Sequence, residues 1–308
     1  MTEDPWHPRR LAGYGRRPPQ PAWPGGARVA LQFVLNVEEG GERSIANGDA
    51  ESESYLPELA GARSIAGGRG YSMESLFDYG AAVGFWRILR LFEARTLPLT
   101  AFVVGRALEL NPEAGAALAE SGHELAGHGY RWIDYRTVEE AVEREHIART
   151  CRVIEDCTGR PPAGWYTGRV SPVTRRLLVE RGGLLYDADA YDDELPYWLS
   201  DGHRSHLVIP YTLIHNDIRY VLSPGCGHAD AFFALLRDAF DLLWQEGEAA
   251  PRMMSVGLHP RFSGHPARAT ALARFLDHVL DKGGAWICRR QEIAEHWRRH
   301  HPPPPPTT

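Results

Sequence analysis

Two histidines each stand where a predicted strand ends and a loop containing glycine or proline begins. His128 closes the run LAGH, and His259 closes the run SVGLH. An imidazole titrates near neutral pH, so it can carry a proton to or from a substrate. A lone histidine is more often structural than catalytic, but two at equivalent strand ends favour acid–base chemistry.

Two acidic residues, Glu38 and Glu39, follow another apolar run directly, in NVEEGGE. A solvent-exposed acidic turn would have the same sequence. However, neighbouring carboxylates raise one another's pKa, which would prepare one of them to act as a general base near neutral pH. We therefore predict that Glu38 or Glu39, alone or together with His128, activates water, and that His259 is the acid.

Further polar and aromatic groups follow the later strands. The segment GWYTGR offers Tyr166 and Arg169, and a guanidinium can hold a carboxylate, a ureido oxygen or a developing oxyanion. The alternative is that Arg169 pairs with the acidic segment 187–193 and stabilises the fold. We also predict substrate contacts for Asp189, Tyr211 and Asn216, although the segment HND has the composition of a simple turn.

These residues need a scaffold that brings strand ends together. Apolar strand-like runs alternate with segments of helical periodicity over about 250 residues, which indicates an α/β fold with a parallel sheet. Strands are predicted at 27–37, 99–105, 123–128, 163–166, 184–189, 206–211, 252–259 and 285–289, and the main helices at 73–95, 137–156, 230–248 and 266–282. Because nearly every strand ends in polar or aromatic groups, we favour a (β/α) barrel whose strand ends meet in one mouth.

Composition limits the domain organisation and the partners. Residues 1–26 are predicted to form an extended arm, 27–298 a single catalytic domain, and 299–308 a disordered proline-rich tail. The net charge of −6 argues against nucleic acid as a partner. No apolar run is long enough to span a membrane, and the first residues lack a secretory signal, so we expect a cytoplasmic protein.

The motifs VEEG, HGYRW, WYTGR, DADAY and LHP together resemble those of the polysaccharide deacetylase (NodB-homology, carbohydrate esterase family 4) superfamily. The resemblance implies a distorted (β/α) barrel in which the first acid is the base, while the second acid and two histidines hold a divalent metal. Here Glu38-Glu39 replaces the usual aspartate pair, and Trp132 stands where the second metal-binding histidine is expected. If any metal bound, only Glu39 and His128 would remain to hold it.

A closer resemblance, over residues 9–298, is to the metal-independent allantoinase branch of this superfamily, the PuuE type. It is carried by LAGYGRRPP, ALQFVLNVEEGGE, GHGYRWIDY, DADAYDDELPYW and MMSVGLHPR. It implies hydrolysis of a cyclic amide, allantoin to allantoate, without a cofactor, with Trp132 packing against a small ring, and a homotetrameric assembly. The alternatives are a metal-dependent polysaccharide or peptidoglycan deacetylase, another cyclic imide hydrolase of this fold, or a non-catalytic binding protein.

Overall fold

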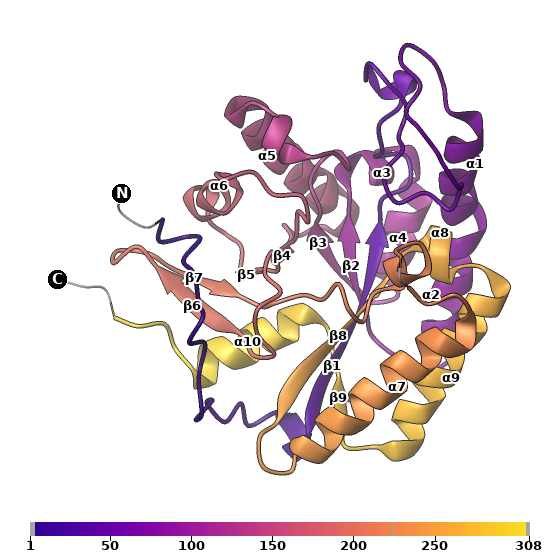
Figure 1. Ribbon diagram of the computed structural model, residues 1–308. Helices are drawn as coiled ribbons and strands as arrows, with labels where there is room; N and C mark the ends of the chain where they lie inside the picture. Colours follow the sequence, from indigo (N-terminus) through magenta and orange to yellow (C-terminus); the bar gives the residue numbers. More distant parts are fainter. Residues whose placement is uncertain (1–3, 224, 306–308) are drawn as a thin grey trace.

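The computed structural model describes residues 4–223 and 225–305, and its centre is a sheet of mostly parallel strands (Figure 1). Along the sheet the order is β6-β7-β5-β4-β3-β2-β1-β8, with β9 pairing beside β1. The strand bounds are β1 Val29–Val37, β2 Thr100–Val103, β3 Glu124–Gly127, β4 Gly164–Trp165, β5 Tyr186–Asp187, β6 Tyr197–Ser200, β7 Ser205–Val208, β8 Arg252–Leu258 and β9 Ala285–Ile287.

Strand β1 is buried on both faces, and its alternation divides the core into two parts. Val29, Leu31, Phe33 and Leu35 pack beneath the outer helices, whereas Ala30 and Val34 point into the barrel interior. Side chains two residues apart on a strand share a face, so Asn36 and Glu38 continue the interior row. Glu39, one residue later, falls on the opposite side.

Helices surround the sheet, and α7 and α9 lie side by side along β1 and β8 (Figure 1). The α-helices are α1 Tyr71–Tyr79, α2 Phe85–Glu93, α3 Gly105–Leu110, α4 Pro112–Glu120, α5 Glu140–Thr158, α6 Thr174–Arg181, α7 Ala229–Glu246, α8 Pro260–Ser263, α9 Pro266–Lys282 and α10 Arg290–His300. Short helical turns lie at η1 Pro24–Gly26, η2 Ile45–Asn47, η4 Tyr135–Thr137 and η5 Asp217–Tyr220. In the part of the chain described, no helix is long and apolar enough to cross a bilayer.

The helix predicted at 73–95 is present but is interrupted by a π-helical turn, η3 Gly80–Gly84. A Cβ atom at Gly84 would lie 2.0 Å from the Pro260 carbonyl oxygen, and one at Gly80 would lie 2.6 Å from Glu39 Oε1. The two glycines therefore let this turn approach Glu39 and the start of α8 more closely than any other residue would. π-Turns of this kind are frequent at functional sites.

The predicted barrel is confirmed as a distorted, incompletely closed one. Among the residues described, the sheet ends at β6 and β8, and no ladder pairs these two strands. Over the described ranges of the chain, the one strand absent from the sequence prediction is β6, a four-residue antiparallel edge strand that follows the acidic segment 187–193. Its side chains alternate between buried and half-buried positions, and its antiparallel pairing with β7 defines it as a strand.

The described part of the arm, residues 4–26, packs against the domain through two buried tryptophans: Trp6 lies against β6 and β7, and Trp23 lies against α10. At the other end, the predicted tail boundary at 299 is wrong. Helix α10 continues to His300, and the Trp198 indole donates a hydrogen bond to the His301 carbonyl at 2.8 Å. Residues 306–308 of the predicted tail lie outside the described residues.

Candidate active site

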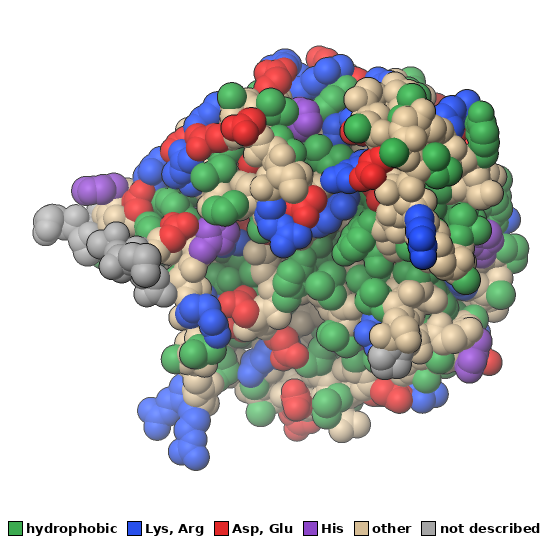
Figure 2. Space-filling model, turned by 45° about the horizontal axis from the view of Figure 1, so that its top comes forward, with side chains coloured by type: hydrophobic (Ala, Val, Ile, Leu, Met, Phe, Trp, Pro, Cys, Tyr) green, Lys and Arg blue, Asp and Glu red, His purple; other side chains and the backbone are tan. Residues whose placement is uncertain are grey.

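The carboxyl ends of the strands surround a small pocket, and hydrophobic side chains gather near the centre of this face (Figure 2). The cavity measures about 110 Å³, small beside the roughly 300–1,000 Å³ of pockets for drug-sized ligands. Its walls come from the ends of β1, β3, β4, β7 and β8 and from the loops that follow. They consist of Asn36, Glu38, Tyr55, Leu56, His128, Trp132, Tyr166, Thr167, Gly168, Arg169, Tyr191, Tyr211, Leu213, Asn216, Ile218 and His259.

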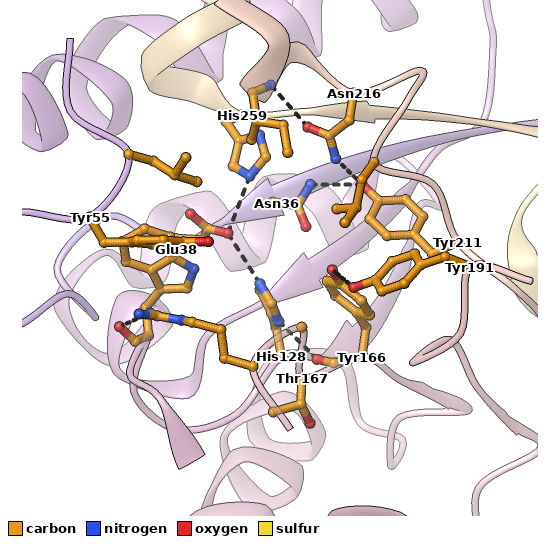
Figure 3. Close-up of a pocket in the computed structure, with 16 residues that line it drawn as sticks. Asn36, Glu38, Tyr55, His128, Tyr166, Thr167, Tyr191, Tyr211, Asn216 and His259 are labelled. Atoms are coloured by element: carbon orange, nitrogen blue, oxygen red, sulfur yellow. Dashed lines mark hydrogen bonds and ion pairs between the residues drawn. The ribbon is translucent and has the colours of Figure 1, made fainter. Parts of the chain in front are cut away.

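Glu38 is the centre of the polar network (Figure 3). Its Oε1 lies 3.1 Å from His128 Nε2 and 3.3 Å from His259 Nε2, and its Oε2 accepts a hydrogen bond from Arg261 at 2.7 Å. Burial alone would raise the pKa of Glu38, but the charges of His259 and Arg261 and the histidine hydrogen bonds hold it well below its ordinary value. Glu38 is therefore an ionised carboxylate shielded from bulk water.

His259 is held between two carboxylates. Its Nδ1 lies 2.6 Å from Asp217 Oδ1, and the other Asp217 oxygen accepts from the backbone N–H groups of His259 and Ser263. Burial opposes the charged ring, but Glu38 and Asp217 together raise the pKa of His259 to about 9. At neutral pH His259 is therefore an imidazolium, a proton donor aimed into the pocket through Nε2.

His128 has an oxygen atom opposite each ring nitrogen. Nδ1 lies 2.8 Å from the Tyr166 carbonyl oxygen, which can only accept, so Nδ1 carries a proton. Nε2 then faces Glu38 Oε1 at 3.1 Å. If the His128 ring is neutral, Nε2 carries no proton, and its lone pair faces a lone pair of Glu38 Oε1. A hydrogen bond between His128 Nε2 and Glu38 Oε1 therefore requires a proton on one of these two atoms.

Arg261 and Glu39 lie behind the pocket rather than in its wall. The Arg261 guanidinium spans the two glutamates, 2.7 Å from Glu38 Oε2 and 3.9 Å from Glu39 Oε1. Burial, the largest effect, raises the pKa of Glu39 to about 7. The nearby charge of Arg261 acts in the opposite direction and lowers it. Glu39 Oε1 has no hydrogen-bond partner among the described residues.

Trp132 packs between two guanidinium groups. Its ring centroid lies 4.4 Å from the Arg169 Cζ and 4.9 Å from the Arg261 Cζ. Arg169 donates to the Trp132 carbonyl at 2.6 Å and also lies over the Tyr55 ring at 4.9 Å. Arg169 lines the pocket, and a guanidinium there can donate hydrogen bonds to an acceptor bound in the cavity.

The opposite wall presents an amide and a phenol (Figure 3). Asn36 Nδ2 donates to the Tyr211 hydroxyl at 3.0 Å and to the Leu258 carbonyl at 3.1 Å, which leaves Asn36 Oδ1 available to accept. Asn216 Nδ2 also lies 3.4 Å from the Tyr211 hydroxyl. Because Tyr211 accepts these N–H groups, its own O–H can donate. This wall therefore matches a group with one N–H and one C=O.

The structure brings together eight of the ten residues predicted from sequence. Glu39 and Asp189 do not line the pocket. Asp189 instead accepts from the backbone N–H groups of Thr167 and Gly168 at 2.7–3.0 Å and so fixes the pocket wall from behind. The eight that line it are Glu38, His128, Trp132, Tyr166, Arg169, Tyr211, Asn216 and His259.

The alternative in which Arg169 pairs with the acidic segment 187–193 is wrong. Arg175 makes that contact, with two hydrogen bonds of 2.7 and 2.9 Å to the buried Asp187. Sequence reasoning also missed Asn36, Asp217 and Arg261 as parts of the site. A polar Asn in an apolar strand, two residues before Glu38, was the one available signal for Asn36.

The donors present do not match the metal site that the deacetylase fold implies. A metal would need several carboxylate or imidazole ligands directed at one point. Among residues 4–223 and 225–305, no group of three His, Cys, Asp or Glu side chains is so arranged. Glu39 and His128, the two ligands that sequence comparison leaves, do not share the cavity. The Arg261 guanidinium lies between the two carboxylates instead.

Comparison with known proteins places this site in a family. The polysaccharide deacetylase family profile matches residues 69–179. A Schizosaccharomyces pombe protein, named provisionally as a polysaccharide deacetylase, is 40% identical over 294 residues, covering 89% of this chain and 92% of its own length.

Two crystal structures share the fold closely. One, from Pseudomonas aeruginosa PAO1 and also named provisionally as a polysaccharide deacetylase, has a TM-score of 0.94 at 52% identity, covering 97% of this chain and 100% of its own. The PuuE allantoinase structure has a TM-score of 0.94 at 51% identity, covering 97% of this chain and 99% of its own. The chain therefore belongs to the polysaccharide deacetylase family and matches its PuuE-type branch.

Proposed function

We propose that this protein hydrolyses a cyclic amide, allantoin to allantoate, without a metal ion. The observation that carries the proposal is the ionised Glu38, buried between two imidazoles and a guanidinium in a cavity of about 110 Å³. Such a cavity suits a small ring. The 51% identical PuuE allantoinase structure supports the same substrate class.

The His128–Glu38 pair is the general base in this proposal. Water adds to the ring carbonyl carbon, and the proton that it loses is taken up between His128 Nε2 and Glu38 Oε1, which lie 3.1 Å apart. Because these two atoms share the proton, their lone pairs no longer repel each other. Arg169, which lines the pocket, stabilises the oxygen that becomes negative. Glu39, which lies outside the pocket, takes no direct part.

His259 is the general acid. When the carbon–nitrogen bond breaks, the Nε2 proton passes to the leaving ring nitrogen, and the product carboxylic acid then loses its own proton. Asp217 keeps His259 charged and fixes its orientation through Nδ1. The Asn36–Tyr211 wall supplies one acceptor and one donor, which match the N–H and C=O of a ureide.

A second candidate, deacetylation of an N-acetylated sugar, is favoured by the family profile and by the names of several relatives. The two candidates separate in one experiment. Chelator-treated protein is incubated with racemic allantoin, and allantoate is measured; N-acetylglucosamine oligomers with added Zn²⁺ form the second arm. We expect ring opening in the first arm and no acetate release in the second. The opposite pattern would refute the proposal, and turnover of hydantoin or dihydrouracil alone would redirect it to another cyclic imide.

A further inference from the structure

The strongest unexplained feature outside the pocket wall is a fully buried arginine between two buried glutamates. Arg261 follows His259 by two residues, at the start of α8. Its side chain is 3% exposed, and the side chains of Glu38 and Glu39 are as deeply buried. A cation this deep is costly to desolvate, so its position calls for a reason.

The side chains around Arg261 hold its guanidinium in one position. Phe77, Trp132 and Phe262 present aromatic rings with centroids 4.5–4.9 Å from its Cζ atom. Aromatic faces attract a guanidinium, so these three rings stabilise the cation. One nitrogen, Nη1, makes the contacts with Glu38 and Glu39. The remaining nitrogens, Nε and Nη2, have no hydrogen-bond partner among the described residues.

Trp132 connects this cluster to the altered metal motif. The indole stands at the position where metal-dependent relatives are expected to have a histidine ligand, and it packs on Arg261. A ring that binds a metal has thus been exchanged for a ring that covers a guanidinium. Gly80 completes the enclosure, because its missing side chain leaves room for Glu39 Oε1 and for the Arg261 backbone.

We propose that Arg261 is the resident cation of this site, a positioning residue that takes the place of a divalent metal. From behind the pocket, its guanidinium orients Glu38 so that Oε1 faces both imidazoles, while Oε2 is held at 2.7 Å. The inference concerns the architecture of the site described under the proposed function. It is testable without any substrate, so its failure can be told apart from failure of that function.

The substrate-free test removes the cation and offers a free one. In Arg261→Ala, millimolar methylguanidinium should raise the thermal midpoint in a saturable way. It should not do so in wild type or in the control Arg95→Ala, which loses an exposed arginine paired with Asp277. Adding Glu38→Gln to Arg261→Ala should abolish the effect. Absence of saturable stabilisation in folded Arg261→Ala would overturn the proposal.

A second pair of variants keeps the proposal testable if Arg261→Ala does not fold. Arg261→Lys retains the charge, whereas Arg261→Met retains an unbranched apolar stem. If Arg261 is the resident cation, the Lys variant should have a higher thermal midpoint and a higher kcat than the Met variant. Because Arg261 does not line the pocket, the Met variant should lose about 10- to 100-fold in kcat with little change in KM. Equal behaviour of the two variants, or a better Met variant, would show that Arg261 merely fills space.

Discussion

Asp217→Asn should move the alkaline limit of activity to lower pH. The substitution keeps the shape of the side chain but removes a charge that lies 2.6 Å from His259 Nδ1. An opposite charge within about 4–6 Å shifts a pKa by roughly 1–3 units. The pKa of His259, about 9 in the native protein, should therefore fall to between about 6 and 8 in the variant.

The size of the effect depends on the pH of the assay. At pH 8, the protonated fraction of His259 should fall from about 90% to between about 50% and 1%. The measurement is the pH dependence of kcat for allantoin ring opening, because loss of the acid appears as the descending alkaline limb. Asp277→Asn, a surface carboxylate bound to Arg95, is the control and should leave that limb in place. An alkaline limb near pH 9 in Asp217→Asn would refute the assignment of His259 as the acid.

The contact between His259 and Asp217 also affects protein stability, which can be measured without substrate. The pKa of His259 is raised from an ordinary 6.5 to about 9, so its protonation stabilises the folded state fully below about pH 6.5. That contribution, ~3 kcal/mol, is lost as the pH rises through 9. The free energy of unfolding should fall over this window in wild type and fall less in Asp217→Asn, as measured by urea denaturation at several pH values.

Three further substitutions probe the buried charges. Glu38→Gln should lower kcat by about 10²- to 10⁴-fold with an unchanged circular dichroism spectrum, and near-native activity would contradict its place in the base. Glu39→Gln removes a carboxyl group whose pKa is raised to about 7. Because this carboxyl is protonated more readily in the folded than in the unfolded state, the native protein loses stability as the pH rises from about 4.5 to 7. The variant should match wild type near pH 4 and be at least as stable at pH 8, and a lower thermal midpoint at pH 8 would argue against this. Arg175→Leu strips the buried Asp187 of its main partner and should cost about 3–5 kcal/mol in urea denaturation, whereas a loss below ~1 kcal/mol would mean that His206 suffices.

Much of the scaffold could be predicted because hydrophobic periodicity reports directly on strands and helices. The strands at 27–37 and 252–259 and the helices at 230–248 and 266–282 are long, strongly patterned segments, and the structure contains each of them within a few residues. The π-turn at Gly80–Gly84 and the strand β6 could not be predicted in this way. The π-turn depends on close contact with Pro260 and Glu39, and β6 is defined by its antiparallel pairing with β7 next to an acidic segment.

By itself, the sequence determined the chemical inventory of the site: which strand ends carry Glu38, His128 and His259, and that Trp132 stands where a metal ligand is expected. Tertiary structure alone decided which of two adjacent glutamates faces the pocket. Side chains alternate across a strand, so Glu38 joins Asn36 in the interior while Glu39 turns toward Gly80. It also brought Asp217 and Arg261 to opposite sides of the His259–Glu38 pair, across 42 and 223 residues of chain. Charges so distant in sequence set one another's protonation only when folding excludes the water between them.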